Sequence, residues 1–233
     1  MSKPKIGAVI LSRFSSSRLP GKALMQIEGK AILQYIVERL LISLDRQDIV
    51  IATSTETSDN SIAEFAKSIA VRCYRGSLEN VAVRFFEAAT TTNWDYIMRI
   101  NGDNIFVDTK VVSSMMQIAQ TDKYSFISNV KNRTFPKGMS VEIVKISYYK
   151  KLLPIISASD SYREHVTLYL YDNEELNNYY YFTNTILPQA SGLQFALDTK
   201  EDFERTTKII SQFKTAHTNY NLNEIFEIYQ ENN

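Results

Sequence analysis

The sequence is poor in cysteine and histidine, carries no net charge and contains no long apolar run. Its single cysteine, Cys73, excludes an internal disulfide bond and is consistent with a reducing compartment. One cysteine and two histidines, His165 and His217, cannot supply the usual ligand set of a zinc site. Because 26 basic and 26 acidic residues balance, no overall field favours nucleic acid or an anionic membrane, and any anion site must be local.

No apolar window is long enough to span a bilayer, and the apolar run near the start of the chain is too short for a signal peptide. We therefore expect a cytoplasmic protein that binds neither nucleic acid nor membrane.

Strand and helix patterns alternate over the first 120 residues. Helices are predicted at residues 31–41, about 58–69, 78–91 and 110–120, with Ser58 and Asp59 suited to cap the second of them. Four apolar strands are predicted at residues 5–11, 48–53, 71–74 and 95–100. These strands lack polar alternation, as expected when helices cover both faces of a parallel sheet. The prediction is an α/β fold with a doubly wound, mostly parallel, Rossmann-like sheet, whose nucleotide-binding core is residues 1–120.

The pattern is less regular between residues 121 and 190. Strands are predicted there at residues 124–130, 139–144 and 176–182, and helices at 147–153 and 160–171. A last core strand at 193–197 and helices at 199–213 and 222–230 complete the chain. We expect one domain, 1–233, with an insertion at 121–190 that faces the substrate. Its aromatic strand carries the Tyr and Phe side chains that are enriched between subunits, which favours a homodimer.

Residues 6–24, IGAVILSRFSSSRLPGKAL, are the first candidate site. An apolar strand stops at Ser12, and Arg13, Arg18 and Lys22 follow among serines and a Pro-Gly turn. Cations after a buried strand suit a polyanion such as a nucleoside triphosphate. The segment has no Walker A spacing and no GxGxxG fingerprint. The alternative is a loop whose cations face only water.

Two aspartates are predicted at the same edge of the sheet. Asp103 follows the strand at 95–100, although Asn-Gly and Gly-Asp also form plain turns. Asp198 follows the strand at 193–197, although Asp198 or Thr199 could simply cap the next helix. Two carboxylates facing a cationic loop suit Mg²⁺ held against phosphate oxygens.

The segment SRFSSSRLPGKAL resembles the ARxxSxRLPGK signature of the cytidylyltransferases that activate sugar acids. Further similar segments recur in that family's order over about residues 5–205: TSTETSDN, RGSLENVAVRFFEAA, RINGDN, PKGMSVEIV, REHVTLYLY and LDTKEDFE. Arg75-Gly76-Ser77 and the run 163–167 favour the spore-coat-polysaccharide type over the related CMP-Kdo synthetases. Phe14 and Ser16 depart from the signature, and Ser140 stands where relatives often have Asp, which bears on the acceptor sugar.

The resemblance implies roles for individual residues. Lys22, Arg18 and Asp103 are the expected catalytic residues, and Asp103 and Asp198 the metal ligands. The expected nucleotide-binding residues are Leu11, Arg13, Ser15, Arg18, Lys22, Asn80 and Arg84, and the expected sugar-side residues are Glu142, Arg163 and His165.

The resemblance implies Mg²⁺-dependent transfer of CMP from CTP to a sugar, with release of pyrophosphate. The sugar is expected to be a sugar acid, and the activated sugar is expected to serve surface polysaccharide synthesis. One alternative is a glycosyltransferase of similar fold, although Asp103-Asn104-Ile105 lacks the second carboxylate of an Asp-x-Asp motif. The other is a non-catalytic module that binds nucleotide sugars.

For His165 the alternative to a sugar-side role is a packed core histidine, and Cys73 is expected to be buried. The sequence does not name the sugar.

Overall fold

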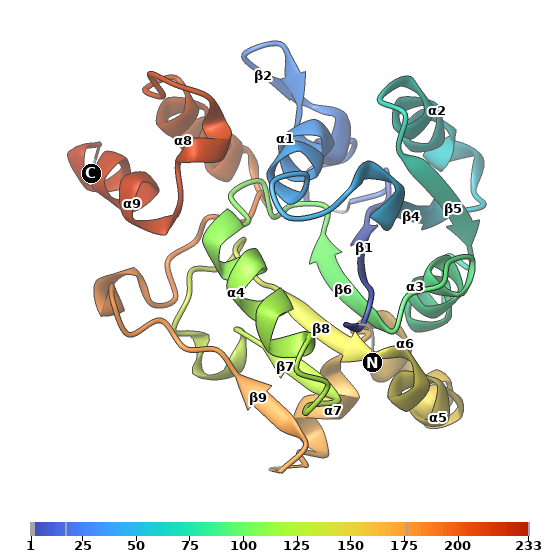
Figure 1. The fold of residues 1–233 in the computed structure, drawn as a ribbon. Helices are drawn as coiled ribbons and strands as arrows, with labels where there is room; N and C mark the ends of the chain where they lie inside the picture. Colours follow the sequence, from blue (N-terminus) through green and yellow to red (C-terminus); the bar gives the residue numbers. More distant parts are fainter. Residues whose placement is uncertain (1–2, 17, 176, 233) are drawn as a thin grey trace.

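A seven-stranded sheet forms the centre of the molecule (Figure 1). The computed structural model describes residues 3–16, 18–175 and 177–232. The strands lie in the order β5-β4-β1-β6-β8-β7-β9, and only β8 runs antiparallel to its neighbours. Their bounds are β1 (Ile6–Leu11), β4 (Ile49–Ser54), β5 (Arg72–Gly76), β6 (Tyr96–Asn101), β7 (Phe126–Ser128), β8 (Glu142–Lys145) and β9 (Tyr179–Tyr181). The predicted doubly wound, mostly parallel α/β fold is confirmed.

Helices cover both faces of this sheet. The bounds are α1 (Ile32–Leu40), α2 (Asn60–Ser68), α3 (Val81–Thr90), α4 (Thr109–Ala119), α5 (Ile146–Ser157), α6 (Asp160–Glu164), α7 (Leu168–Asp172), α8 (Lys200–Ile210) and α9 (Leu222–Glu231). A two-stranded hairpin, β2 (Gln26–Ile27) and β3 (Lys30–Ala31), precedes α1. Over the described residues, none of the helices combines the length and the apolar character needed to cross a membrane.

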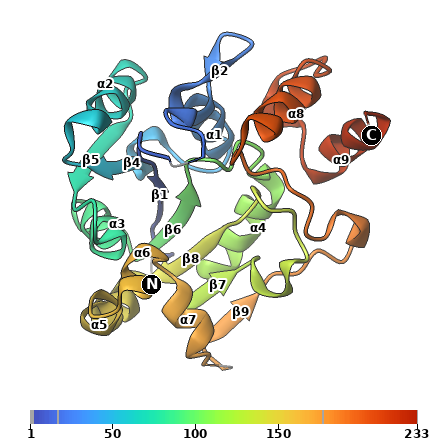
Figure 2. The same cartoon turned by 180° about the vertical axis from the view of Figure 1, so that it is seen from behind.

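The alternating side chains of β1 divide the core in two. Ala8 and Ile10 pack into a cluster with α1, α2, α4, α8 and α9, which Figure 1 shows largely in front of the sheet. Val9 and Leu11 pack into a second cluster with α3, α5 and α7, and α5, α6 and α7 come to the front in the reverse view (Figure 2). Because both faces are covered, the strands are apolar on both sides, as the sequence indicated.

The predicted last core strand at residues 193–197 is wrong. Apart from one isolated parallel bridge between Gln194 and Lys137, this segment pairs with no strand. Phe195 and Leu197 are nevertheless buried in the core, and this is why the segment has the apolar sequence that is typical of a buried strand. The N–H of Leu197 donates to the carbonyl oxygen of Asp103 at 3.3 Å, which places the segment across the loop that follows β6.

Other predictions differ from the structure in detail. The helix predicted at 160–171 is two helices, α6 and α7, because Val166 has a left-handed φ of 40°. Strand β8 begins at Glu142 rather than at 139. Cys73 is exposed, because β5 is an outer strand of the sheet.

The aromatic strand β9 is shorter than predicted and half-buried, and Leu176, where it was expected to begin, lies outside the described residues. A homodimer built through β9 stays a prediction.

Candidate functional site

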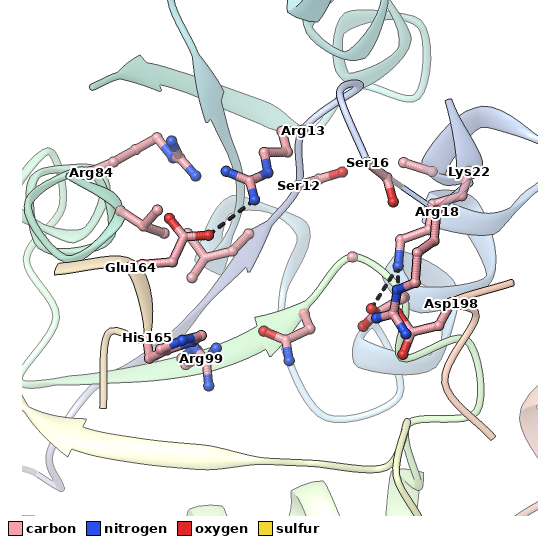
Figure 3. A pocket seen from close by; sticks show the side chains of 16 residues that line it. Ser12, Arg13, Ser16, Arg18, Lys22, Arg84, Arg99, Glu164, His165 and Asp198 are labelled. Carbon is pink, nitrogen blue, oxygen red and sulfur yellow. Dashed lines mark hydrogen bonds and ion pairs between the residues drawn. The ribbon is translucent and has the colours of Figure 1, made fainter. Parts of the chain in front are cut away.

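The carboxyl ends of β1 and β6 lie side by side and open into a cavity of about 290 Å³ (Figure 3). In the sheet Leu11 pairs with Asn101, so the loops that follow them meet. The N–H of Gly102 donates to the carbonyl oxygen of Leu11 at 2.8 Å, and a Cβ on Gly102 would lie 2.9 Å from the Ser12 side chain. Glycine is therefore needed for these two loops to approach this closely.

Five cations line this cavity, and a second cavity of about 570 Å³ adjoins it. The cations of the first cavity are Arg13, Arg18, Lys22, Arg84 and Arg99, and its acidic residues are Asp103, Glu164 and Asp198. The two cavities share Arg99, Asn101, Asp103, His165 and Asp198. The two predicted metal ligands therefore stand where the cavities join, which is the position for a group that acts between two bound molecules.

Lys22 and Arg18 both reach Asp198 (Figure 3), and Lys22 also reaches Asp103. The Lys22 ammonium lies 2.8 Å from Asp103 Oδ2 and 3.2 Å from Asp198 Oδ1, and it donates to the carbonyl oxygen of Leu197 at 2.6 Å. Arg18 Nη2 is 3.0 Å from the same Asp198 oxygen. The next helix is capped by Thr199 in a capping box with Asp202, which leaves the Asp198 carboxylate free to face these cations.

On the opposite wall of the cavity, Figure 3 shows Arg13 and Arg84 beside Glu164. Arg13 Nη2 lies 3.0 Å from Glu164 Oε1, a contact that joins the loop after β1 to the end of α6. Arg84 is buried and donates to the carbonyl oxygen of Ser77 at 2.6 Å. Burial, together with the charge of Arg13, lowers the pKa of the Arg84 guanidinium. An anion in the cavity would relieve this unfavourable concentration of positive charge.

Asp59 holds the loop after β1, and the sequence assigned it only a capping role. It stands at the start of α2, but its side chain makes no capping hydrogen bond there. It accepts instead from the N–H of Phe14 at 2.6 Å and from both the N–H and the hydroxyl of Ser54. Burial would raise the pKa of the Asp59 carboxyl, but these hydrogen bonds outweigh it and lower that pKa. In the sequence, the only indication of this role is the Ser/Thr-rich segment TSTETSDN, which contains Asp59.

The second cavity is lined by a partly buried ion pair between Arg99 of β6 and the buried Glu142 of β8. Glu142 also accepts from the Thr167 hydroxyl at 2.8 Å and the Tyr171 hydroxyl at 2.6 Å. Burial acts to lower the pKa of the Arg99 guanidinium, but the Glu142 carboxylate more than compensates, so the pKa is raised. Arg133 adds further positive charge to this cavity. Its lining is therefore suited to an acidic polar ligand.

Three predicted residues line neither cavity. Asn80 caps α3 by accepting from the N–H of Val83 at 3.0 Å. Arg163 pairs with Asp160 at 2.8 Å within α6. Ser15 does not line the cavity, whereas Ser16, one of the two departures from the family signature, does.

His165 is exposed and lines both cavities, so it is not a core histidine. His217 is buried elsewhere, with Nε2 2.7 Å from Glu38.

The donor set around the Lys22 ammonium fits a hard divalent cation. Two carboxylates and one carbonyl oxygen converge on a single position, and oxygen is the ligand that Mg²⁺ prefers. Among the described residues, no group of three Asp, Glu, His or Cys side chains surrounds a metal position. One or two carboxylates are enough for Mg²⁺ when substrate phosphates and water complete its coordination.

A family model described as cytidylyltransferase matches residues 8–231 of the chain. The chain belongs to the cytidylyltransferase family. It is similar to the spore coat polysaccharide biosynthesis protein SpsF of Bacillus subtilis, with 32% identity over 202 residues, which cover 84% of this chain and 82% of that protein. This confirms the resemblance that the motifs indicated.

Two solved structures support the fold of this cytidylyltransferase. A cytidylyltransferase from Leptospira borgpetersenii is 29% identical, with a TM-score of 0.89 over 98% of this chain and 95% of that one. A CMP:2-keto-3-deoxy-manno-octonic acid synthetase complexed with CTP has a TM-score of 0.68 over 89% of this chain and 99% of that one. At 18% identity the second structure supports the fold alone.

Proposed function

We propose that this chain transfers CMP from CTP to a sugar and releases pyrophosphate, with Mg²⁺ held by Asp103 and Asp198. The observation that carries the proposal is the pair of adjoining cavities with these two carboxylates at their junction. A nucleotide in the cationic cavity and an acceptor in the second cavity would meet beside them. An oxygen of the acceptor would attack the α-phosphorus, and the bond from that phosphorus to the pyrophosphate oxygen would break.

The cations of the first cavity would bind and orient the triphosphate. Lys22 is a compact charge on a flexible stem, whereas Arg13, Arg18 and Arg84 offer planar pairs of donors that match phosphate oxygens. Catalysis of this kind rests mainly on positioning and on neutralising charge as it develops on the phosphates. When bound, Mg²⁺ would supply two further positive charges for that neutralisation.

The acceptor would occupy the second cavity, and we propose that it is a sugar acid. Arg133 and Lys137 line this cavity together with Arg99, so a carboxylate on the sugar would meet positive charge. Glu142 and His165 offer an acceptor and a donor for hydroxyl groups. Ser140 also lines this cavity, where its small side chain leaves room for the acceptor.

A screen for pyrophosphate release tests this proposal. Four nucleoside triphosphates are crossed with a panel of Kdo-like, nonulosonic and neutral sugars, and release is expected only with CTP and an acidic sugar. Release of a nucleoside diphosphate from a nucleotide sugar would instead support a glycosyltransferase. Tight CTP binding without turnover on any sugar would support a non-catalytic module.

The metal assignment is tested by the substitution Asp103→Asn. Turnover is expected to fall by about a hundredfold or more, which is the scale of removing one electrostatic stabiliser. Asp45→Asn is the matched control, because Asp45 is exposed just before β4, at the opposite edge of the sheet. Normal turnover by a folded Asp103→Asn variant would refute the role of this carboxylate.

A further inference from the structure

The ammonium group of Lys22 lies where the proposed metal would lie. Its three oxygen neighbours, on Asp103, Leu197 and Asp198, are the same atoms that suit a divalent cation. We propose that Lys22 is a resident counter-ion, which holds this position until a nucleotide binds and thereby makes metal binding depend on nucleotide binding. The inference rests on the proposed metal site, and it adds a role for Lys22 before any reaction.

Charge balance supports this role. Asp103 and Asp198 carry two negative charges, and Lys22 and Arg18 carry two positive charges within 3.2 Å of them. The side chains of Lys22, Asp103 and Asp198 are only 15%, 21% and 23% exposed, so water screens the cluster incompletely. A divalent cation that entered while Lys22 remained would leave two uncompensated positive charges in this partly buried site.

Steric exclusion acts in the same direction. The ammonium nitrogen is 2.6 Å from the Leu197 carbonyl oxygen and 2.8 Å from Asp103 Oδ2. Mg²⁺ binds its oxygen ligands at about 2.0–2.1 Å, so it cannot share the space between these oxygens with an ammonium group. Lys22 must therefore leave before both carboxylates can turn to a metal.

A nucleoside triphosphate would provide the place to which Lys22 moves. Lys22 lines the cationic cavity and begins a short 3-10 helix, Lys22–Leu24, so rotation of its own four-carbon side chain can redirect the ammonium while the backbone stays in place. Phosphate oxygens would then take over the ammonium, and the freed carboxylates would accept the metal. Because linkage is reciprocal, the nucleotide would raise the affinity for metal by the same factor as the metal raises the affinity for nucleotide.

The test measures Mn²⁺ binding in the absence of nucleotide, by electron paramagnetic resonance of the free ion. Lys22→Met removes the charge and keeps most of the side-chain volume, and Lys22→Gln removes the charge but keeps a polar end. Both variants are expected to bind Mn²⁺ at least tenfold more tightly than the wild-type chain, which corresponds to about 1.4 kcal/mol. The added substitution Asp103→Asn is expected to abolish this gain.

Lys145→Gln is the matched control, because Lys145 also lies in an ion pair, at 2.7 Å from Asp122, but outside both cavities. It is expected to leave Mn²⁺ affinity unchanged. Thermal melts establish that each variant is folded.

Equal Mn²⁺ affinity in the wild-type chain and both Lys22 variants would refute the counter-ion role. If Mn²⁺ binding in the CTP complex were still lost on Asp103→Asn, the metal site itself would stand. A gain that survives Asp103→Asn would place the new metal elsewhere and refute the inference together with the metal assignment.

Discussion

Replacement of Asp59 by asparagine should destabilise the protein and loosen its nucleotide-binding loop. Asp59 is 1% exposed and fixes the start of that loop through the N–H of Phe14, while its other oxygen accepts from two donors of Ser54. Asparagine is nearly isosteric but has one acceptor oxygen. Either the loop or the end of β4 must therefore lose its acceptor and face an NH₂ group instead.

The expected loss of stability follows from these contacts. A hydrogen bond to a charged group contributes about 1.5–3 kcal/mol, and a buried donor left without an acceptor costs about 1–3 kcal/mol. Loss of the Phe14 contact alone therefore predicts a decrease of about 2–4 kcal/mol in the free energy of unfolding. Because Phe14 also accepts from Ser16 and Gly21 through its carbonyl oxygen, the loop should become less ordered, and the KM for the nucleotide should rise more than kcat falls.

Urea unfolding followed by tryptophan fluorescence measures the stability. The chain has one tryptophan, Trp94, which is buried and donates to Asp48 at 2.7 Å, so its emission reports on the folded core. Asp160→Asn is the control, because the Asp160 side chain is 90% exposed, and it should change the unfolding free energy very little.

The pH dependence separates the charge of Asp59 from its shape. The folded-state pKa of Asp59 is lowered, so its stabilising effect is fully present above the unfolded value of about 3.9 and is lost as pH falls through the folded value. The wild-type chain should exceed Asp59→Asn by a constant amount near neutral pH, and the difference should shrink below about pH 4. An asparagine variant as stable as the wild-type chain at pH 7, with an unchanged KM, would refute this reasoning.

Two further substitutions probe the second cavity by the same urea unfolding measurement. Gly138→Ala should destabilise the protein by more than about 2 kcal/mol, because the φ angle of Gly138 is 91° and the new Cβ would lie 2.4 Å from the backbone of Phe195. Gly29→Ala is the comparison. The φ angle of Gly29 is 73° but no atom lies near its new Cβ, so it should cost only about 1 kcal/mol. Glu142→Gln should cost about 1–3 kcal/mol because it leaves the partly buried guanidinium of Arg99 without its carboxylate, and an equally stable variant would contradict a stabilising ion pair.

The sequence was sufficient to predict the part of the site that depends on topology alone. Parallel strands end at one edge of a sheet, so the cations after β1 and Asp103 after β6 were expected at the same edge once the strands were recognised. They are neighbours because β1 and β6 are adjacent strands, which the structure shows. Asp198 was placed at this edge for a partly wrong reason, because no strand precedes it. Its position comes from the burial of Phe195 and Leu197 and from the contact of Leu197 with Asp103, and such tertiary packing has no local sequence signal.

Two of the residues that the sequence misplaced have two compatible local roles. Asp59 and Asn80 both stand at the start of a helix, where either side chain could cap. Asn80 caps α3, whereas Asp59 turns away because Phe14 and Ser54 offer it three donors from other elements. The break between α6 and α7 was also not predictable from periodicity, because it depends on a single left-handed residue, Val166, which follows the cavity-lining His165.

The ion pairs of the cationic cavity bear on the choice of ligand. Lys22, Arg18 and Arg13 each lie against a carboxylate, so a phosphate gains their attraction only by replacing an existing partner. Arg84 donates instead to a backbone carbonyl oxygen and is available to an anion at once. A ligand with a single phosphate would gain Arg84 and little more, whereas a triphosphate can replace several carboxylates together. This arrangement favours nucleoside triphosphates over monophosphates by the number of cations they release, and the Asp103 and Asp198 carboxylates released from Lys22 and Arg18 then become available to a metal.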